Sequence, residues 1–291
     1  MGAALADAYP EARAVFDEAD EALGTSLSRT CWEGPMERLT ETENAQPALL
    51  THSVAVARVL AGRGIAAGAA AGHSLGEFSA HVAAGSMEFA DAVRLVRARG
   101  EAMAAAGRER PGTMAALLGL EPEQARALCD AARGEGEVLE PANVNSPGQI
   151  VISGSVPAVR RAIETAPAHG ARRAVELTVS GAFHSPLMAP ARATLEEALS
   201  AVTLQTARIP VVANVDGRPV QEPEAIRRAL LDQLTAPVQW ILCVTALRDM
   251  GARTFLELGS GGVLTGLLRR IDRSLEGRAV GDPEEVEAAA A

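Results

Sequence analysis

The 291-residue sequence contains no lysine, so all 27 of its basic residues are arginines. This absence excludes a lysine nucleophile, a Schiff-base or pyridoxal-phosphate site, and a phosphate-binding loop of the usual lysine-containing kind. Any cation that holds a substrate anion must be an arginine, whose planar guanidinium matches a carboxylate with two parallel hydrogen bonds.

Aromatic residues, cysteines and long apolar runs are also scarce. Aromatics make up 3% of the chain, so Ala, Leu and Val must fill the core. Cys31, Cys129 and Cys243 are widely spaced, and no pair has metal-ligand spacing; we expect buried thiols in a reducing compartment and no metal site. The N-terminus lacks a signal-peptide pattern and no apolar run reaches membrane-spanning length, which predicts a cytoplasmic protein without a membrane partner.

The charge balance is acidic, with 27 basic against 37 acidic residues and a formal net charge of −10. A nucleic-acid partner is not expected, because such a surface needs a basic stripe. An acidic partner would have to meet a local arginine cluster. The candidate pairs are Arg160 with Arg161, Arg172 with Arg173, and Arg269 with Arg270, although each is equally compatible with a solvated face.

The hydrophobic pattern predicts an α/β fold with two domains. Residues 1–110 are mostly of helical pattern, and residues 180–291 alternate helices with short strands. Between them, residues 111–179 have a β-α-β-β-α-β order, which predicts a ferredoxin-like small domain inserted in a large α/β-hydrolase-like domain with a parallel sheet. The acidic, alanine-rich tail from Asp282 is expected to be loose.

The segment Gly72-His73-Ser74-Leu75-Gly76 fits the G-x-S-x-G nucleophile elbow. A short run of small residues precedes it and a helical pattern follows, as the strand-turn-helix context of an elbow requires. Such a turn exposes the Ser74 hydroxyl and places the Leu75 N–H, at a helix N-terminus, where it can stabilise an oxyanion. The alternative is a glycine-rich turn with an incidental serine.

A nucleophilic serine needs a base, and His184 is the candidate among five histidines. It lies in Gly181-Ala182-Phe183-His184, just after a predicted strand, and loops beyond strand ends carry catalytic groups in open α/β folds. The alternative is a histidine that caps the helix expected from Ser185.

Together these segments resemble the two signature motifs of malonyl-CoA:acyl-carrier-protein transacylases, Gly72 to Glu77 and Gly181 to His184. Asn143 to Gln149, Pro237-Val238-Gln239-Trp240 and Glu257-Leu258-Gly259 resemble further motifs of that family. The similarity runs from residue 1 to about residue 275 in the same order and spacing.

The resemblance implies a role for each site residue. Ser74 is acylated, and His184 accepts its proton while a backbone carbonyl near Gln239 orients the ring. Arg99 pairs with the free carboxylate of malonate, unless it is only a solvated surface arginine.

The resemblance also suggests how the cleft is lined. Phe183 favours malonyl over methylmalonyl, and Asn143 and Asn145 line the cleft unless they serve only the turn that follows them.

One feature departs from the family pattern. Its members begin with a short strand and a Gly-Gln-Gly-Ser-Gln loop, whereas Met1-Gly2-Ala3 aligns just after that segment. The loop glutamine supplies part of the family's oxyanion hole, and losing such a donor costs on the order of a hundredfold in rate. We expect the true start to lie upstream of Met1.

The function that follows is malonyl transfer from CoA to the phosphopantetheine thiol of an acyl carrier protein through a serine ester, with no cofactor and a monomeric enzyme. One alternative is a serine hydrolase or thioesterase, although no acid stands out as a third triad member. Another is a truncated, catalytically impaired homologue that binds acyl thioesters without turnover. The sequence leaves open whether the carrier serves fatty-acid or polyketide synthesis.

Overall fold

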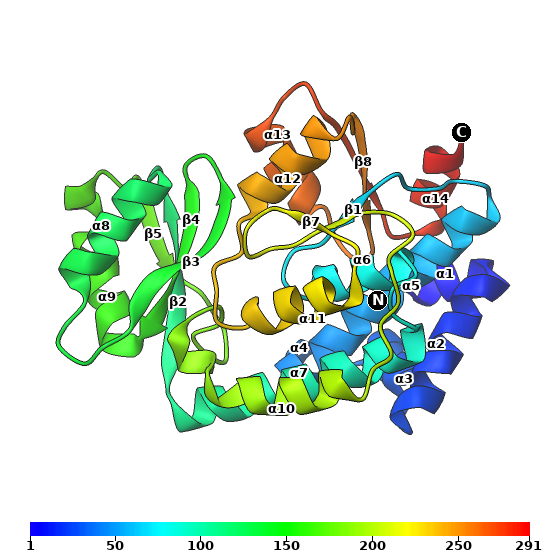
Figure 1. The fold of residues 1–291 in the computed structure, drawn as a ribbon, viewed down its shortest axis with the longest axis horizontal. Coiled ribbons are helices and arrows are strands. Elements are labelled where there is room, and N and C mark those ends of the chain that lie inside the picture. Colours follow the sequence, from blue (N-terminus) through cyan, green and yellow to red (C-terminus); the bar gives the residue numbers. More distant parts are fainter.

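A computed structural model describes all residues, 1–291, as two units joined side by side (Figure 1). The smaller unit contains the elements from β2 to β5 and has its own hydrophobic core around Leu117, Leu128 and Ile150. The larger unit is built from the chain before and after it, and both termini lie in it. None of the helices combines the length and the apolar composition that a membrane span requires.

The larger unit is mostly helical. Its helices are α1 (Ala3–Ala8), α2 (Pro10–Leu23), α3 (Leu27–Glu33), α4 (Met36–Thr40), α5 (Thr42–Gly62), α6 (Leu75–Ala83), α7 (Phe89–Glu109), η2 (Pro186–Met188), α10 (Pro190–Ser200), α11 (Pro223–Asp232), α12 (Trp240–Asp249), α13 (Val263–Ile271) and α14 (Pro283–Ala290). The long helices α5 and α7 pack against each other through the largest core cluster, which includes Val56, Val93 and Val96.

The strands of the larger unit form two small sheets, each of which contains one parallel pair. Strand β1 (Ala70–Ala71) pairs in parallel with β6 (Val211–Val212), and β6 pairs antiparallel with β7 (Pro219–Val220). Strands β8 (Thr254–Leu258) and β9 (Glu276–Val280) form a separate parallel pair. The predicted parallel pairing is therefore present, but it is divided between two separate sheets, one of which also contains the antiparallel strand β7.

The smaller unit has the predicted element order. It contains β2 (Gly112–Leu118), α8 (Pro122–Ala132), β3 (Leu139–Ser146), β4 (Gln149–Ser155), α9 (Val156–Thr165), η1 (Ala166–His169) and β5 (Arg173–Glu176). All three strand pairings are antiparallel, in the order β3-β4-β2-β5. The outer strand β3 reaches the larger unit, where the Val144 N–H donates to the Val238 carbonyl.

The tail was expected to be loose, but it forms α14 against the first helices. Asp282 caps this helix by accepting from the Glu285 N–H, and Val286 is fully buried. Glu287 accepts hydrogen bonds from Tyr9 and Arg63. The side chains that dock the tail come from segments more than 200 residues away, which composition does not reveal.

Candidate active site

The elbow at Ser74 forms where β1 ends and α6 begins. Ser74 has φ 50° and ψ −106°, a conformation that L-residues rarely adopt and that is found at strained functional turns. A Cβ at Gly72 would lie 1.9 Å from the carbonyl carbon of Gly76, so only glycine fits there. A Cβ at Gly76 would meet nothing within 4 Å, so the turn needs one of its two glycines for steric reasons.

The Oγ of Ser74 lies 2.8 Å from Nε2 of His184. His184 also has a positive φ, 56°, and these two are the only non-glycine residues with positive φ. Backbone strain of this kind persists only where the surrounding structure enforces it. The structure thus brings together the two residues that the sequence proposes as nucleophile and base.

The other ring nitrogen of His184 fixes its tautomer. Nδ1 donates to the backbone carbonyl of Gln233 at 2.9 Å, which leaves Nε2 unprotonated and able to accept from the Ser74 hydroxyl. The expectation that the carbonyl lies near Gln239 was wrong, because the accepting group belongs to Gln233 six residues earlier. Gln233 is the C-cap residue of α11, and the last carbonyls of a helix have no intrahelical partner.

His184 is neutral across the physiological range. Burial, and then the charge of Arg99, lower the pKa of His184 to about 3. The ring is therefore available as a proton acceptor, and the imidazolium formed during a reaction would depend on the Gln233 carbonyl for stabilisation.

Arg99 lies at the centre of the site and is only 1% exposed, so it is not a solvated surface arginine. Its Nη2 donates to Ser74 Oγ at 3.1 Å and to Gln233 Oε1 at 2.9 Å, while Nη1 donates to Gln46 Oε1 at 2.7 Å. The Nε–H is buried and has no acceptor. Since buried donors are nearly always paired in proteins, this N–H indicates a place for an incoming anion.

Gln233 was missed by the sequence reasoning, although it contacts every central residue of the site. Its Nε2 donates to the Ser74 carbonyl at 2.9 Å and to Glu77 Oε2 at 2.7 Å, and its Oε1 accepts from Arg99. Only its complete burial distinguishes it, and a glutamine at the end of an amphipathic helix gives no local pattern that predicts burial.

The remaining predicted residues surround this centre at different distances. Leu75 is buried at the first position of α6, where its N–H has no partner within the helix. Asn145 Oδ1 accepts a hydrogen bond from Nε2 of His73 at 2.8 Å, so it contacts the elbow. Asn143 is buried and bridges to Val238 through its backbone. Phe183 packs against the core of the larger unit and against a small cluster of Met114, Ala142 and Val151 in the smaller unit.

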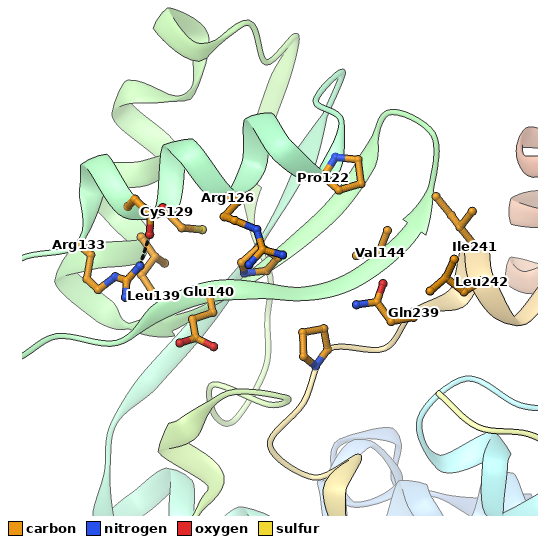
Figure 2. A pocket seen from close by; sticks show the side chains of 13 residues that line it. Pro122, Arg126, Cys129, Arg133, Leu139, Glu140, Val144, Gln239, Ile241 and Leu242 are labelled. Atoms are coloured by element: carbon orange, nitrogen blue, oxygen red, sulfur yellow. Dashed lines mark hydrogen bonds and ion pairs between the residues drawn. The ribbon is translucent and has the colours of Figure 1, made fainter. Parts of the chain in front are cut away.

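Gln239 lies apart from these residues. Figure 2 shows it lining a cavity of about 470 Å³ between α8, β3 and the start of α12, together with Arg126, Glu140 and Val144. Successive side chains of a strand point to opposite faces, so Val144 faces this cavity while Asn145 faces His73. Gln239 makes no hydrogen bond to Ser74, Arg99 or His184; its backbone N–H donates to the Asn214 carbonyl.

Comparison with known proteins gives one consistent family. The acyl transferase domain family matches residues 1–284. The malonyl CoA-acyl carrier protein transacylase of Bacillus subtilis is 46% identical over 289 residues, 99% of this chain and 91% of the relative. The enzyme of that name from Escherichia coli K12 is 45% identical, over 99% of this chain and 94% of the relative.

Solved structures agree with the sequence comparison. The malonyl-CoA:acyl carrier protein transacylase of Xanthomonas oryzae matches with a TM-score of 0.96 and 45% identity, covering 100% of this chain and 92% of the other. A malonyl-transacylase in complex with a type II polyketide synthase acyl-carrier protein also matches at 0.96, with 42% identity over 100% and 94%. This chain therefore belongs to the acyl transferase family and, within it, to the malonyl-CoA:acyl carrier protein transacylases.

Proposed function

We propose that this chain transfers a malonyl group from CoA to the phosphopantetheine thiol of an acyl carrier protein through an ester at Ser74. The observation that carries the proposal is the contact of Ser74 Oγ with both His184 Nε2 and Arg99 Nη2. A nucleophile, its base and a buried cation within hydrogen-bond reach of one oxygen suit an acyl group that ends in a carboxylate.

In the first half-reaction the malonyl carboxylate pairs with Arg99, whose free Nε–H supplies a donor. Ser74 Oγ attacks the thioester carbon as its proton passes to His184 Nε2, and the Leu75 N–H donates to the oxyanion. The C–S bond then breaks, and the CoA sulfur leaves with the proton from His184. A malonyl ester on Ser74 and neutral His184 remain.

The second half-reaction reverses these steps with another thiol. The carrier's phosphopantetheine thiol gives its proton to His184 while its sulfur attacks the ester carbonyl. The C–O bond to Ser74 breaks, and Oγ recovers the proton from His184. The two half-reactions form a ping-pong cycle, which predicts parallel lines in initial-rate plots against the two substrates.

Selectivity follows from the buried charge. An acetyl group would leave the Arg99 guanidinium desolvated without an anion, which is costly. Phe183, next to His184 and packed against hydrophobic clusters of both units, restricts the space for a branched acyl group and supports malonyl over methylmalonyl. Asn143 and Asn145 support the side of the cleft contributed by β3.

For the architecture, we propose a ferredoxin-like domain of residues 111–179 inserted in an α/β-hydrolase-like domain of residues 1–110 and 180–291. The antiparallel order β3-β4-β2-β5 with two crossing helices and a separate core supports the first assignment. The strand-elbow-helix at Ser74 supports the second. A monomeric state, a cytoplasmic location and the lack of a cofactor stay predictions from the sequence.

The test is covalent labelling. The chain is incubated with radiolabelled malonyl-CoA or acetyl-CoA and quenched in acid, and the label on protein is counted, with Ser74→Ala as the blank. We expect malonyl label that is absent from the blank, little acetyl label, and transfer of the label to a holo carrier protein. Label released to water at the rate of its formation would instead indicate a thioesterase, and a folded chain that takes up no label would indicate a non-catalytic homologue.

A further inference from the structure

Among the 37 acidic residues, Glu77 alone is fully buried, and the proposed cycle gives it no step. It lies in the first turn of α6, three residues after Ser74. Its Oε2 accepts from Gln233 Nε2 at 2.7 Å and from the Asn214 N–H at 3.1 Å, and its Oε1 has no partner. Burying a carboxylate is costly, so a position of this kind calls for a physical reason.

Glu77 determines which way the Gln233 amide points. The amide nitrogen faces two acceptors, Glu77 and the Ser74 carbonyl, and the amide oxygen faces the donor Arg99. A flipped amide would set its oxygen against both acceptors and its NH₂ group against the guanidinium. The Glu77 carboxylate and the Arg99 guanidinium therefore fix the orientation of the Gln233 amide by bonding to its nitrogen and its oxygen, respectively. The backbone carbonyl of Gln233 in turn orients His184.

Asn214 connects Glu77 to the elbow by a second route. Its N–H donates to Glu77, its Oδ1 accepts from the Ser74 N–H at 2.7 Å, and its Nδ2 donates to the Gly72 carbonyl at 2.8 Å. Oε2 of Glu77 thus accepts hydrogen bonds from both Gln233 and Asn214, the two residues whose side chains bond to the backbone of the elbow.

Charge gives Glu77 a further effect. Arg99 and the imidazolium that forms at His184 place two cations in one buried region, and Arg99 already lowers the pKa of His184. The Glu77 carboxylate is linked to Arg99 through the side-chain amide of Gln233. Its negative charge offsets the two positive charges when His184 takes up the proton.

We propose that Glu77 is a positioning residue for acyl transfer, orienting Gln233 and balancing Arg99 so that Ser74 and His184 are held for attack. The proposal rests on the function proposed above. Glu77 itself touches neither the substrate nor the reacting atoms.

Protonation of Glu77 should be visible in the rate. The titratable and charged groups that face it are Arg99 on α7, Asp216 after β6 and Cys243 on α12. Burial raises the pKa of Glu77 to about 7, whereas the pKa of His184 is lowered to about 3. As the pH falls below about 7, Glu77 becomes neutral and acylation slows while His184 is still unprotonated.

The experiment measures single-turnover acylation of Ser74 by malonyl-CoA from pH 5.5 to 8.5, a half-reaction that needs no carrier thiol. The variants are Glu77→Gln, which keeps volume and hydrogen-bonding capacity but removes the charge, and Asp216→Asn, which removes a nearby carboxylate that does not contact Gln233. Circular dichroism and thermal unfolding confirm that each variant is folded.

We expect E77Q to acylate roughly tenfold more slowly at pH 8, because loss of a neighbouring charge shifts a buried pKa by about one unit. The half-saturating malonyl-CoA concentration should stay equal or fall, since Arg99 loses its internal anion, and the decline near pH 7 should disappear. D216N should acylate at the parent's rate at pH 8, and its decline should begin at a slightly lower pH, because the charge of Asp216 helps to raise the pKa of Glu77. Glu77→Asp keeps the charge on a shorter stem; we expect it to keep the decline near neutral pH while acylating more slowly.

A folded E77Q whose rate lies within twofold of the parent, with the same pH profile, would overturn the role of Glu77 while the proposed function stands. If E77Q does not fold, a folded E77D that acylates at the parent's rate would overturn it equally, because the shorter side chain withdraws the carboxylate from Gln233. If the parent chain takes up no malonyl group, the proposed function fails first, and the role of Glu77 with it.

Discussion

Arg99 donates a hydrogen bond to Ser74 Oγ at 3.1 Å, so the cation expected to hold the substrate's carboxylate also touches the nucleophile. The distance between the Ser74 Oγ and the guanidinium that would bind the carboxylate is therefore fixed before the substrate binds. Because malonate carries its carboxylate two bonds from the thioester carbon, a guanidinium in contact with the nucleophile suits this chain length. The same contact favours the ionised form of the serine during attack.

Replacing Arg99 with alanine should abolish the preference for malonyl. Removing one partner of a buried charge pair costs about 2–5 kcal/mol, so the acylation efficiency with malonyl-CoA should fall about a hundredfold or more. Acetyl-CoA should be affected much less, because its acyl group makes no ion pair. Arg97→Ala is the matched control on the same helix, since Arg97 bonds to Asn44 away from Ser74. Equal losses with both substrates would show that Arg99 has no role in selectivity.

The two glycines of the elbow should respond in opposite ways to alanine. At Gly72 the added Cβ would lie 1.9 Å from backbone, so the turn must distort, and we expect a loss of about 3 kcal/mol or more in the free energy of unfolding. At Gly76 the Cβ meets nothing and the residue is helical, so alanine should raise stability by roughly 0.5–1 kcal/mol. Urea denaturation of both variants measures the difference, and a tolerated Gly72→Ala would contradict the elbow geometry described above.

The sequence predicts those site residues that lie in a recognisable local motif, and it does not predict those whose role depends on contacts made by folding. Ser74 and His184 follow short strand-like runs and lie in motifs with turn residues, so sequence reasoning selects them. Gln233 owes its importance to Arg99, Glu77 and Ser74, which are brought to it by folding. The orienting carbonyl was assigned to the wrong segment for the same reason: a backbone carbonyl has no sequence signature.

The fold shows a similar division. The β-α-β-β-α-β order from β2 to β5 was predictable because each element has a clear hydrophobic period and the turns are short. Strand β9 and helix α14 were missed because Glu276 to Val280 is short and charged, and the last residues are acidic and alanine-rich. Both are stabilised by tertiary partners, β8 for the strand and the first helices for α14.

Gln233 and Gln239 offer a direct comparison between the structural and the sequence-based assignments. Gln233→Leu removes the hydrogen bonds of the side-chain amide to Ser74 and Arg99, while the backbone carbonyl still orients His184. We expect acylation to slow by roughly tenfold to a hundredfold. Gln239→Leu changes only the lining of the cavity on the other face of β3, so acylation should stay within about twofold. Single-turnover labelling with malonyl-CoA measures both rates. A larger loss for Gln239→Leu than for Gln233→Leu would show that Gln239, and not Gln233, supports the reaction at Ser74.

His81 should make the fold sensitive to mild acid. It is fully buried, with Nδ1 bonded to Ser86 Oγ at 2.9 Å and no partner for Nε2, and burial lowers its pKa from 6.5 to about 4. Between these two values the unfolded chain binds a proton that the folded chain does not, so the contribution of His81 to stability is complete above pH 6.5 and is lost as the pH falls toward 4.

A shift of this size corresponds to about 3 kcal/mol in the free energy of unfolding when it is fully developed. Urea denaturation at pH 7 and pH 4.5 should therefore show a smaller loss for His81→Leu than for the parent chain, by about 2 kcal/mol. The lowered pKa of His184 also makes the protein less stable as the pH falls, whereas the pKa of Glu77, raised to about 7, makes it more stable. Both residues are present in the parent and in the variant, so their contributions cancel in the difference. Identical losses in parent and variant would show that folding does not lower the pKa of His81 and would contradict the prediction.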